Sequence, residues 1–248
     1  MKAVADWRNK VNSHRFTTVA FLVLTFVMVL EAREMSSQDA KTKYPHMAAV
    51  EEYLMADRNA EIALARSAAP ESISHDATVL VLGQHGYETA VEGRNGFVCV
   101  VDRSWMLPFD NPEFWNPKVR LPACMNPPGA RFHLPLTFKA TGLALSGVSN
   151  NEMLDRLKAA YNNKELPLPE NGSMCYMMSK RQYFADNVGN AGDSHLMFWF
   201  AQGEHMAWGA DSPDSPIDVH QYSPQPITEF SISVAKWSDG TVARTNQH

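Results

Sequence analysis

The first 32 residues most constrain what this chain can fold into, because they have the features of a leader that precedes the folding part. A basic segment is followed by an uncharged, mostly apolar run from Phe16 to Leu30, and polar sequence begins at Glu31. A positive segment before a short apolar one is typical of a secretory signal peptide. We therefore expect an exported protein, periplasmic or secreted, whose cysteines meet an oxidising environment.

Residues 1–32 are interpreted as a signal peptide that is cleaved after Ala32. The apolar run is about 15 residues long, shorter than the roughly 20 residues of a membrane-spanning helix. Leu30 occupies the third position before the cut, where a small residue is usual. An uncleaved N-terminal anchor is therefore the alternative, with the polar and flexible lead-in at 33–44 as its tether.

Residues 45–248 predict a single globular domain, since the chain is 45% hydrophobic and long enough for one sizeable core. A helix is predicted over 45–67 from apolar residues at helical spacing. Strands are predicted at 78–82, 87–92 and 97–103. The last two flank Gly93-Arg94-Asn95-Gly96, a run typical of a hairpin turn.

The stretch from 104 to 129 is rich in proline and aromatic residues, which predicts a long irregular loop packed onto the body. Two helices are predicted after it, one from Pro135 to Gly147 and one that opens with the capping pair Ser149 and Glu152.

Three strands follow, at 174–178, 195–201 and 228–236. This order favours an α+β fold: a mostly antiparallel sheet with a few helices packed on one face.

The charge of the chain excludes one large class of partner. The formal net charge is −5, and no basic cluster follows the leader. Because a nucleic-acid binder needs clustered cations, nucleic acid is not a predicted partner. A membrane is a partner only if the N-terminal segment is uncleaved.

Several short stretches are familiar as a set: Ala63–Pro70, Gly86–Val91, Asn95–Cys99, Met174–Ser179, His195–Phe198 and Ala235–Gly240. Together they resemble a family of exported bacterial proteins with no assigned activity. The resemblance extends over most of residues 46–241. It implies a bacterial source and an envelope or secreted location, and it implies no cofactor or catalytic residue.

The cysteines supply the sharpest enzymatic hypothesis. Cys99, Cys124 and Cys175 predict one disulfide and one free thiol, with the pairing left open. A thiolate nucleophile needs a base, and Cys124 in the proline-rich stretch is the most accessible cysteine. The possible bases are His85, His133, His195 and His205, and with His195 or His205 as the candidate base it would make a Cys/His-dependent hydrolase. These two histidines match no metal-ligand spacing, so neither a metal nor a cofactor is predicted.

Tryptophans supply the alternative hypothesis, in which aromatic faces line a pocket for a small ligand. The candidates are Trp105, Trp115, Trp199 and Trp208. In the other interpretation, these tryptophans attach the long proline-rich loop to the core. Since no recognisable motif joins a nucleophile, a base and an orienting group, the sequence favours binding of a small molecule or an accessory envelope role over catalysis. An envelope scaffold held by an uncleaved anchor is the third hypothesis.

Overall fold

The computed structural model describes residues 43–188, 192–203, 208–210, 212–221 and 224–243. The predicted leader, all but the end of the lead-in and His205 lie outside these residues. None of the helices within the described ranges has the length and apolar character needed to cross a membrane. The described residues from Tyr44 onward belong to one compact unit.

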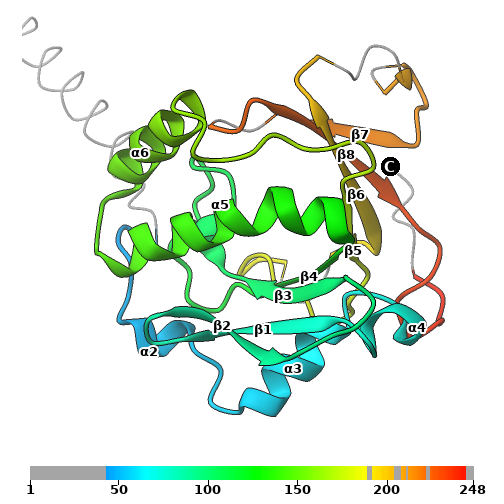
Figure 1. Cartoon of the computed structure of the whole chain (residues 1–248), viewed down its shortest axis with the longest axis horizontal. Helices are drawn as coiled ribbons and strands as arrows, with labels where there is room; N and C mark the ends of the chain where they lie inside the picture. The colour runs from blue at the N-terminus through cyan, green and yellow to red at the C-terminus, as the bar shows by residue number, and fades with distance from the viewer. Residues whose placement is uncertain (1–42, 189–191, 204–207, 211, 222–223, 244–248) are drawn as a thin grey trace, which may run out of the picture. The chain divides into compact units, whose positions relative to one another are not determined.

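A mixed sheet of eight strands forms the centre of the described chain (Figure 1). The strands are β1 (Thr78–Gly83), β2 (Gly86–Val91), β3 (Val98–Asp102), β4 (Leu121–Met125), β5 (Met174–Met177), β6 (His195–Ala201), β7 (Ile217–His220) and β8 (Ile227–Ser233). Their order across the sheet is β2-β1-β3-β4-β5-β6-β8-β7. Strands β1 and β3 are parallel, and the other described neighbours pair antiparallel. The sheet and its helices confirm the α+β class.

Helices cover both faces of this sheet. The described helices are α2 (Val50–Tyr53), α3 (Arg58–Arg66), α4 (Glu71–Ser74), the 3-10 turn η1 (Ser104–Met106), α5 (Pro127–Leu145) and α6 (Asn150–Asn162). Figure 1 shows α3 and α5 on opposite sides of β1 and β3. The expectation of helices on one face is therefore wrong.

The reason for two covered faces lies in β3, which is apolar on both sides. Cys99 and Val101 belong to the buried cluster under α3, whereas Val100 belongs to a second cluster with Phe132 of α5. A strand that is apolar on both faces needs cover on both.

The predicted helix over 45–67 is divided into α2 and α3. Leu54, which ends α2, has an extended backbone. The Asp57 side chain then accepts a hydrogen bond from the Asn59 N–H at 2.8 Å and caps α3. An aspartate side chain that accepts a free N–H favours the start of a new helix at that point. It therefore disfavours a single helix that runs through the aspartate.

The predicted hairpin around Gly93 and Gly96 is also wrong. Strand β2 pairs with β1 through the turn between Gly83 and Gly86, and β3 lies on the other side of β1. The Gly93–Gly96 run instead crosses from β2 past the start of β1, where the Asp76 carbonyl accepts the N–H of Arg94 at 2.8 Å. A turn-forming run predicts a change of direction but does not say which strands it joins.

The proline-rich stretch at 104–129, predicted to be irregular, contains the strand β4 and the start of the helix α5. All five residues of β4 are buried, and α5 begins at Pro127 rather than Pro135. The Asn126 side chain caps α5 through the Gly129 N–H at 2.9 Å. Pro122 is accommodated in β4 because the pairing with β5 covers only Cys124 and Met125.

The capping pair at the start of α6 is confirmed. The hydroxyl of Ser149 accepts the N–H of Glu152 at 3.2 Å, and Ser149 is the residue that precedes the helix.

Candidate functional site

A pocket of about 440 Å³ lies between the sheet and α5. Its floor is one face of β4, β5, β6, β8 and β7. Its walls come from α5, the 105–109 segment, α6 and the residues Phe184, Val188, Gly192 and Asp193. Most of the lining is apolar: Trp105, Met106, Leu107, Pro108, Phe109, Leu121, Ala123, Leu136, Ala140, Leu157, Met177, Phe184, Val188, Met197 and Pro224. This size and lining are typical of small-molecule sites.

Strand register brings the polar residues of the floor together. Trp199 of β6 lies opposite Glu229 of β8, which in turn lies opposite His220 of β7. The next residues on the same face are Ser231 and Asp218. Because side chains alternate between the two faces of a strand, residues two positions apart share the floor.

The innermost polar contact joins Asp102, at the end of β3, to His133 of α5. Their Oδ2 and Nε2 atoms are 2.9 Å apart. Thr137, one helical turn after His133, donates its hydroxyl to Asp102 Oδ1 at 3.4 Å. The buried carboxylate therefore has a partner on each oxygen, and both partners are on α5.

His133 is held from a second side by Trp199. The two rings stack with centroids 5.2 Å apart and an interplanar angle of 13°. When Nε2 donates to Asp102, the neutral imidazole presents Nδ1 as an acceptor. Nδ1 is buried and has no hydrogen-bond partner among the described residues. A buried acceptor without a partner is costly to the folded state.

Glu229 lies at the edge of the same indole. Trp199 Nε1 donates to Glu229 Oε2 at 2.9 Å. Burial raises the pKa of Glu229 to about 7, against the opposing effects of the Trp199 hydrogen bond and the nearby His133. Glu229 is therefore protonated between pH 4.5 and about 7, where an ordinary glutamate is ionised.

The free thiol Cys175 also lines the pocket, but its environment disfavours a thiolate. Burial raises its pKa well above the usual value, and the neighbouring acids Glu229 and Asp102 raise it further. A reactive cysteine needs the opposite, a lowered thiol pKa.

Two histidines at the outer side of the floor have lowered pKa values. Burial lowers the pKa of His195, whose Nδ1 donates to the Asp193 carbonyl at 2.7 Å. Burial likewise lowers the pKa of His220. His133 and His195 are thus two of the possible bases that the structure places in the pocket, whereas His205 lies outside the described residues.

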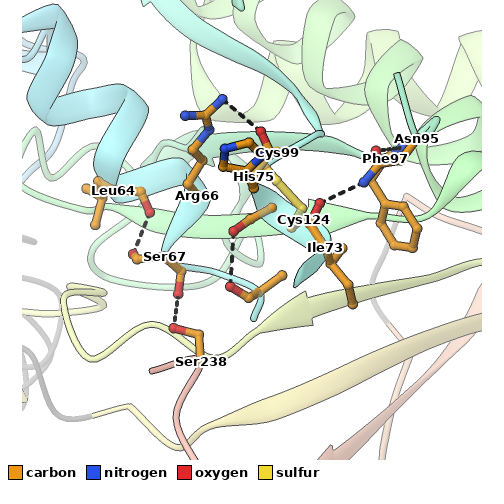
Figure 2. The surroundings of a disulfide bond; sticks show 12 residues. Leu64, Arg66, Ser67, Ile73, His75, Asn95, Phe97, Cys99, Cys124 and Ser238 are labelled. Carbon is orange, nitrogen blue, oxygen red and sulfur yellow. Dashed lines mark hydrogen bonds between the residues drawn. A yellow bond between two sulfur atoms is a disulfide. The ribbon is translucent and has the colours of Figure 1, made fainter. Parts of the chain in front are cut away.

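Cys124 is wrong as a candidate nucleophile, because it is bonded to Cys99. The two cysteines lie opposite each other on β4 and β3. Figure 2 shows the disulfide beside Leu64 and Ser67, at the end of α3. Cys99 and Cys124 belong to the same buried cluster as Leu64 of α3. The disulfide and the pocket are therefore on opposite faces of the sheet.

The four tryptophan candidates divide between three places. Trp105 and Trp199 line the pocket. Trp115 packs against Phe114 in the core, with ring centroids 4.7 Å apart, and fixes its segment to the body. Trp208 is 51% exposed and contacts Phe230, whose side chain alternates with that of Glu229 and therefore faces away from the pocket.

Asp102 and Glu229 were not candidates from the sequence, and His133 was only one of four possible bases, with His85, His195 and His205. The predicted helix begins at Pro135, so the sequence does not place His133 on the helix that positions it. The available signal was on β8, where Glu229, Ser231 and Ser233 alternate with apolar residues. That alternation identifies a polar face, but it does not distinguish bulk solvent from a pocket.

The charges of the lining restrict the ligand. Acids are present at Asp102, Asp193, Asp218 and Glu229, whereas the described lining contains no lysine or arginine. The described lining therefore offers no lysine or arginine side chain to pair with a phosphate or carboxylate. Within the described ranges, no group of three or more His, Cys, Asp or Glu side chains is placed to hold a metal ion.

Comparisons of the chain with protein-family models, with curated proteins and with solved structures found no match.

Proposed function

We propose that this protein binds a small ligand that has a largely apolar body and no negative charge. The observation that carries the proposal is the pocket of about 440 Å³, whose described lining is mostly apolar and whose few polar groups gather on the floor formed by β6, β7 and β8. Apolar surface would supply most of the affinity, and the few polar groups would fix the orientation.

The rival hypothesis, a Cys/His-dependent hydrolase, has less support. Cys99 and Cys124 share a disulfide, which leaves Cys175 as the available thiol. Its raised pKa disfavours the thiolate that such an enzyme uses.

The proposed setting is the periplasm or the exterior of a bacterial cell. The leader-like N-terminus supports it. So does the disulfide, because such bonds persist mainly in oxidising compartments. In this proposal a mostly antiparallel sheet and the proline-rich stretch form the rigid frame of an accessory envelope protein. A scaffold held by an uncleaved anchor would instead keep its full length in the membrane fraction.

Binding is tested with Nile red, an uncharged apolar dye whose fluorescence rises in apolar surroundings. Ser231→Trp fills the centre of the floor, and Ser233→Phe is a milder filling substitution near the rim. We expect both to weaken dye binding by about tenfold or more, as apolar contact area is lost.

The matched control is Trp208→Ala, which removes an exposed aromatic from the opposite face. It should leave dye binding unchanged. If Trp208→Ala abolishes the fluorescence and folded Ser231→Trp and Ser233→Phe retain it, the dye binds elsewhere and the proposed site is wrong. Circular dichroism identifies which variants are folded.

A further inference from the structure

Two carboxyl groups border the same part of the pocket floor. Glu229 and Ser231 of β8 lie opposite His220 and Asp218 of β7, respectively, and all four side chains line the pocket. Glu229 and Asp218 are therefore diagonal neighbours on adjacent strands, a placement in which residues are about 7–8 Å apart. A small group bound between β7 and β8 is within reach of both carboxyl groups.

Glu229 presents one carboxyl oxygen to the pocket. Its Oε2 accepts the Trp199 Nε1 hydrogen bond at 2.9 Å, whereas Oε1 has no hydrogen-bond partner among the described residues. Glu229 is half-buried, and Oε1 is not one of the enclosed, unpartnered side-chain atoms of the described chain. A molecule in the pocket can therefore contact Oε1. Burial raises the pKa of Glu229 to about 7, because the negative charge is poorly stabilised there.

The histidines of the outer floor do not supply a counter-charge. Burial lowers the pKa of His195 and of His220, so both rings are uncharged near neutral pH. His195 Nδ1 donates to the Asp193 carbonyl at 2.7 Å, which leaves Nε2 as a hydrogen-bond acceptor. The described lining also contains no lysine or arginine. The floor thus combines carboxylates with a neutral imidazole acceptor.

We propose that the pocket binds an apolar amine, whose ammonium group lies on the floor between Glu229 and Asp218 and whose apolar body fills the rest of the pocket. This inference rests on the proposed binding function and names the ligand class of the same site. An ammonium group has N–H donors and no acceptor, which matches a floor rich in acceptors. Its hydrogen bond to Glu229 Oε1 is charge-assisted and gives the buried carboxylate its counter-ion.

An ammonium group fits this floor better than other polar groups. A hydroxyl would donate to Oε1 but would leave the charge of Glu229 uncompensated. A carboxylate or phosphate would meet acids on the floor and no lysine or arginine in the described lining. A bare metal ion is disfavoured, because within the described ranges no group of three or more His, Cys, Asp or Glu side chains is placed to hold one.

The test compares three compounds that share one apolar body: the bridgehead amine, alcohol and carboxylate of adamantane. Each competes with Nile red for the intact protein, and loss of dye fluorescence measures its affinity. At a pH of about 8.5 we expect the ammonium to bind about tenfold or more tightly than the alcohol. The carboxylate should bind more weakly than either.

Two conservative substitutions remove the charges assigned to the ammonium site. Glu229→Gln should lower the affinity for the ammonium about tenfold, and Asp218→Asn should lower it about threefold, since Asp218 is exposed and its charge is screened. Affinity for the alcohol should stay within about twofold in both. Glu88→Gln is the matched control, because it changes the net charge equally at an exposed position outside the lining, and it should leave all three affinities unchanged.

The pH dependence identifies Glu229 as the group that meets the ammonium. The amine keeps its own proton throughout the range, and Glu229 becomes ionised as pH rises through about 7. Affinity for the ammonium should therefore rise about fivefold or more between pH values of about 6 and about 8.5. Most of this rise should be absent in Glu229→Gln, and affinity for the alcohol should not rise in either protein. The titratable and charged groups that face Glu229 are His220 and Asp218 on β7, Cys175 on β5, His133 on α5 and Asp102 on β3.

The outcomes distinguish the ligand class from binding itself. Displacement of Nile red by the alcohol and the amine with equal affinity overturns the amine inference and leaves the binding proposal intact. An ammonium preference that is unchanged in folded Glu229→Gln and Asp218→Asn also overturns it, as does failure of the amine to displace the dye. Asp218→Asn decides the matter if Glu229→Gln does not fold. The binding proposal depends separately on the Nile red results with Ser231→Trp, Ser233→Phe and Trp208→Ala.

Discussion

At the scale of the residue, one fully buried ion pair ties the first helices to the sheet. Arg103 and Glu61 are 0% and 2% exposed, and Arg103 Nη2 donates to Glu61 Oε1 at 2.7 Å. Arg103 Nε also donates to the Tyr53 carbonyl at 2.9 Å, and the Leu82 N–H donates to Glu61 at 3.1 Å. The pair thus joins α2, α3, β1 and the end of β3.

We expect Glu61→Gln to destabilise the protein by about 3 kcal/mol. The glutamine keeps an oxygen for Leu82 but leaves the Arg103 charge buried without a counter-ion. Glu88→Gln is the matched control, because Glu88 pairs with Arg58 at the exposed surface and should cost less than about 1 kcal/mol. Urea unfolding at neutral pH measures both. Equal losses in the two variants would contradict the assigned role of the buried pair.

The second expectation at this scale concerns the pH dependence of stability. The pKa of Glu229 is raised from 4.5 to about 7 in the folded state. Between these values the unfolded chain has released the proton and the folded protein still holds it. The free energy of unfolding therefore falls as pH rises from about 4.5 to 7, by up to about 3 kcal/mol, and this contribution is constant above that range.

Glu229→Gln has no proton to lose at this position, so its stability relative to the unmodified protein should increase across the same range. Urea unfolding at a series of pH values measures the difference. A constant difference from pH 4.5 to 7 would show that Glu229 titrates normally.

At the scale of the element, local chemistry made most strands and the start of α6 predictable. The Ser149 cap and the apolar run of β1 depend on neighbours in sequence, and both are where the pattern placed them. The partners of each strand were not predictable in the same way. The Gly93–Gly96 run has turn chemistry, but only the contact of this run with the start of β1 shows that it leads into a parallel strand.

That contact makes Gly93 the residue at which the crossover is most sensitive. A Cβ atom at Gly93 would lie 2.1 Å from the Thr78 backbone nitrogen, so Gly93→Ala must move backbone and should cost several kcal/mol. Gly142, in an exposed position of α5, has nothing within 4 Å of such an atom. Gly142→Ala should therefore stabilise by about 0.5–1 kcal/mol. Thermal unfolding of the two variants should show shifts of opposite sign, and a stable Gly93→Ala would contradict the close approach.

At the scale of the whole molecule, the candidate site could be predicted from the sequence only in small part. Asp102, His133 and Glu229 are far apart in sequence, and they meet because α5 crosses the sheet face next to β6 and β8. His195 and Trp199 were candidates because each residue type alone suggests a role, a possible base for His195 and an aromatic pocket wall for Trp199. A site assembled from three elements leaves no local spacing to recognise.

The sheet also places the Cys99–Cys124 disulfide on one face and the free thiol of Cys175 on the other. Alkylation of the exported protein without reductant, followed by a peptide map, should yield one linked pair that contains Cys99 and Cys124. Cys175 should react only after unfolding, because it is buried and its pKa is raised. The same map reads the N-terminus, which the leader predicts near residue 33. In Cys99→Ser/Cys124→Ser we expect a loss of about 3 kcal/mol in the free energy of unfolding, for a bridge spanning 25 residues. Rapid alkylation of Cys175 in the folded protein would contradict its burial and its raised pKa, and would reopen the cysteine hydrolase hypothesis.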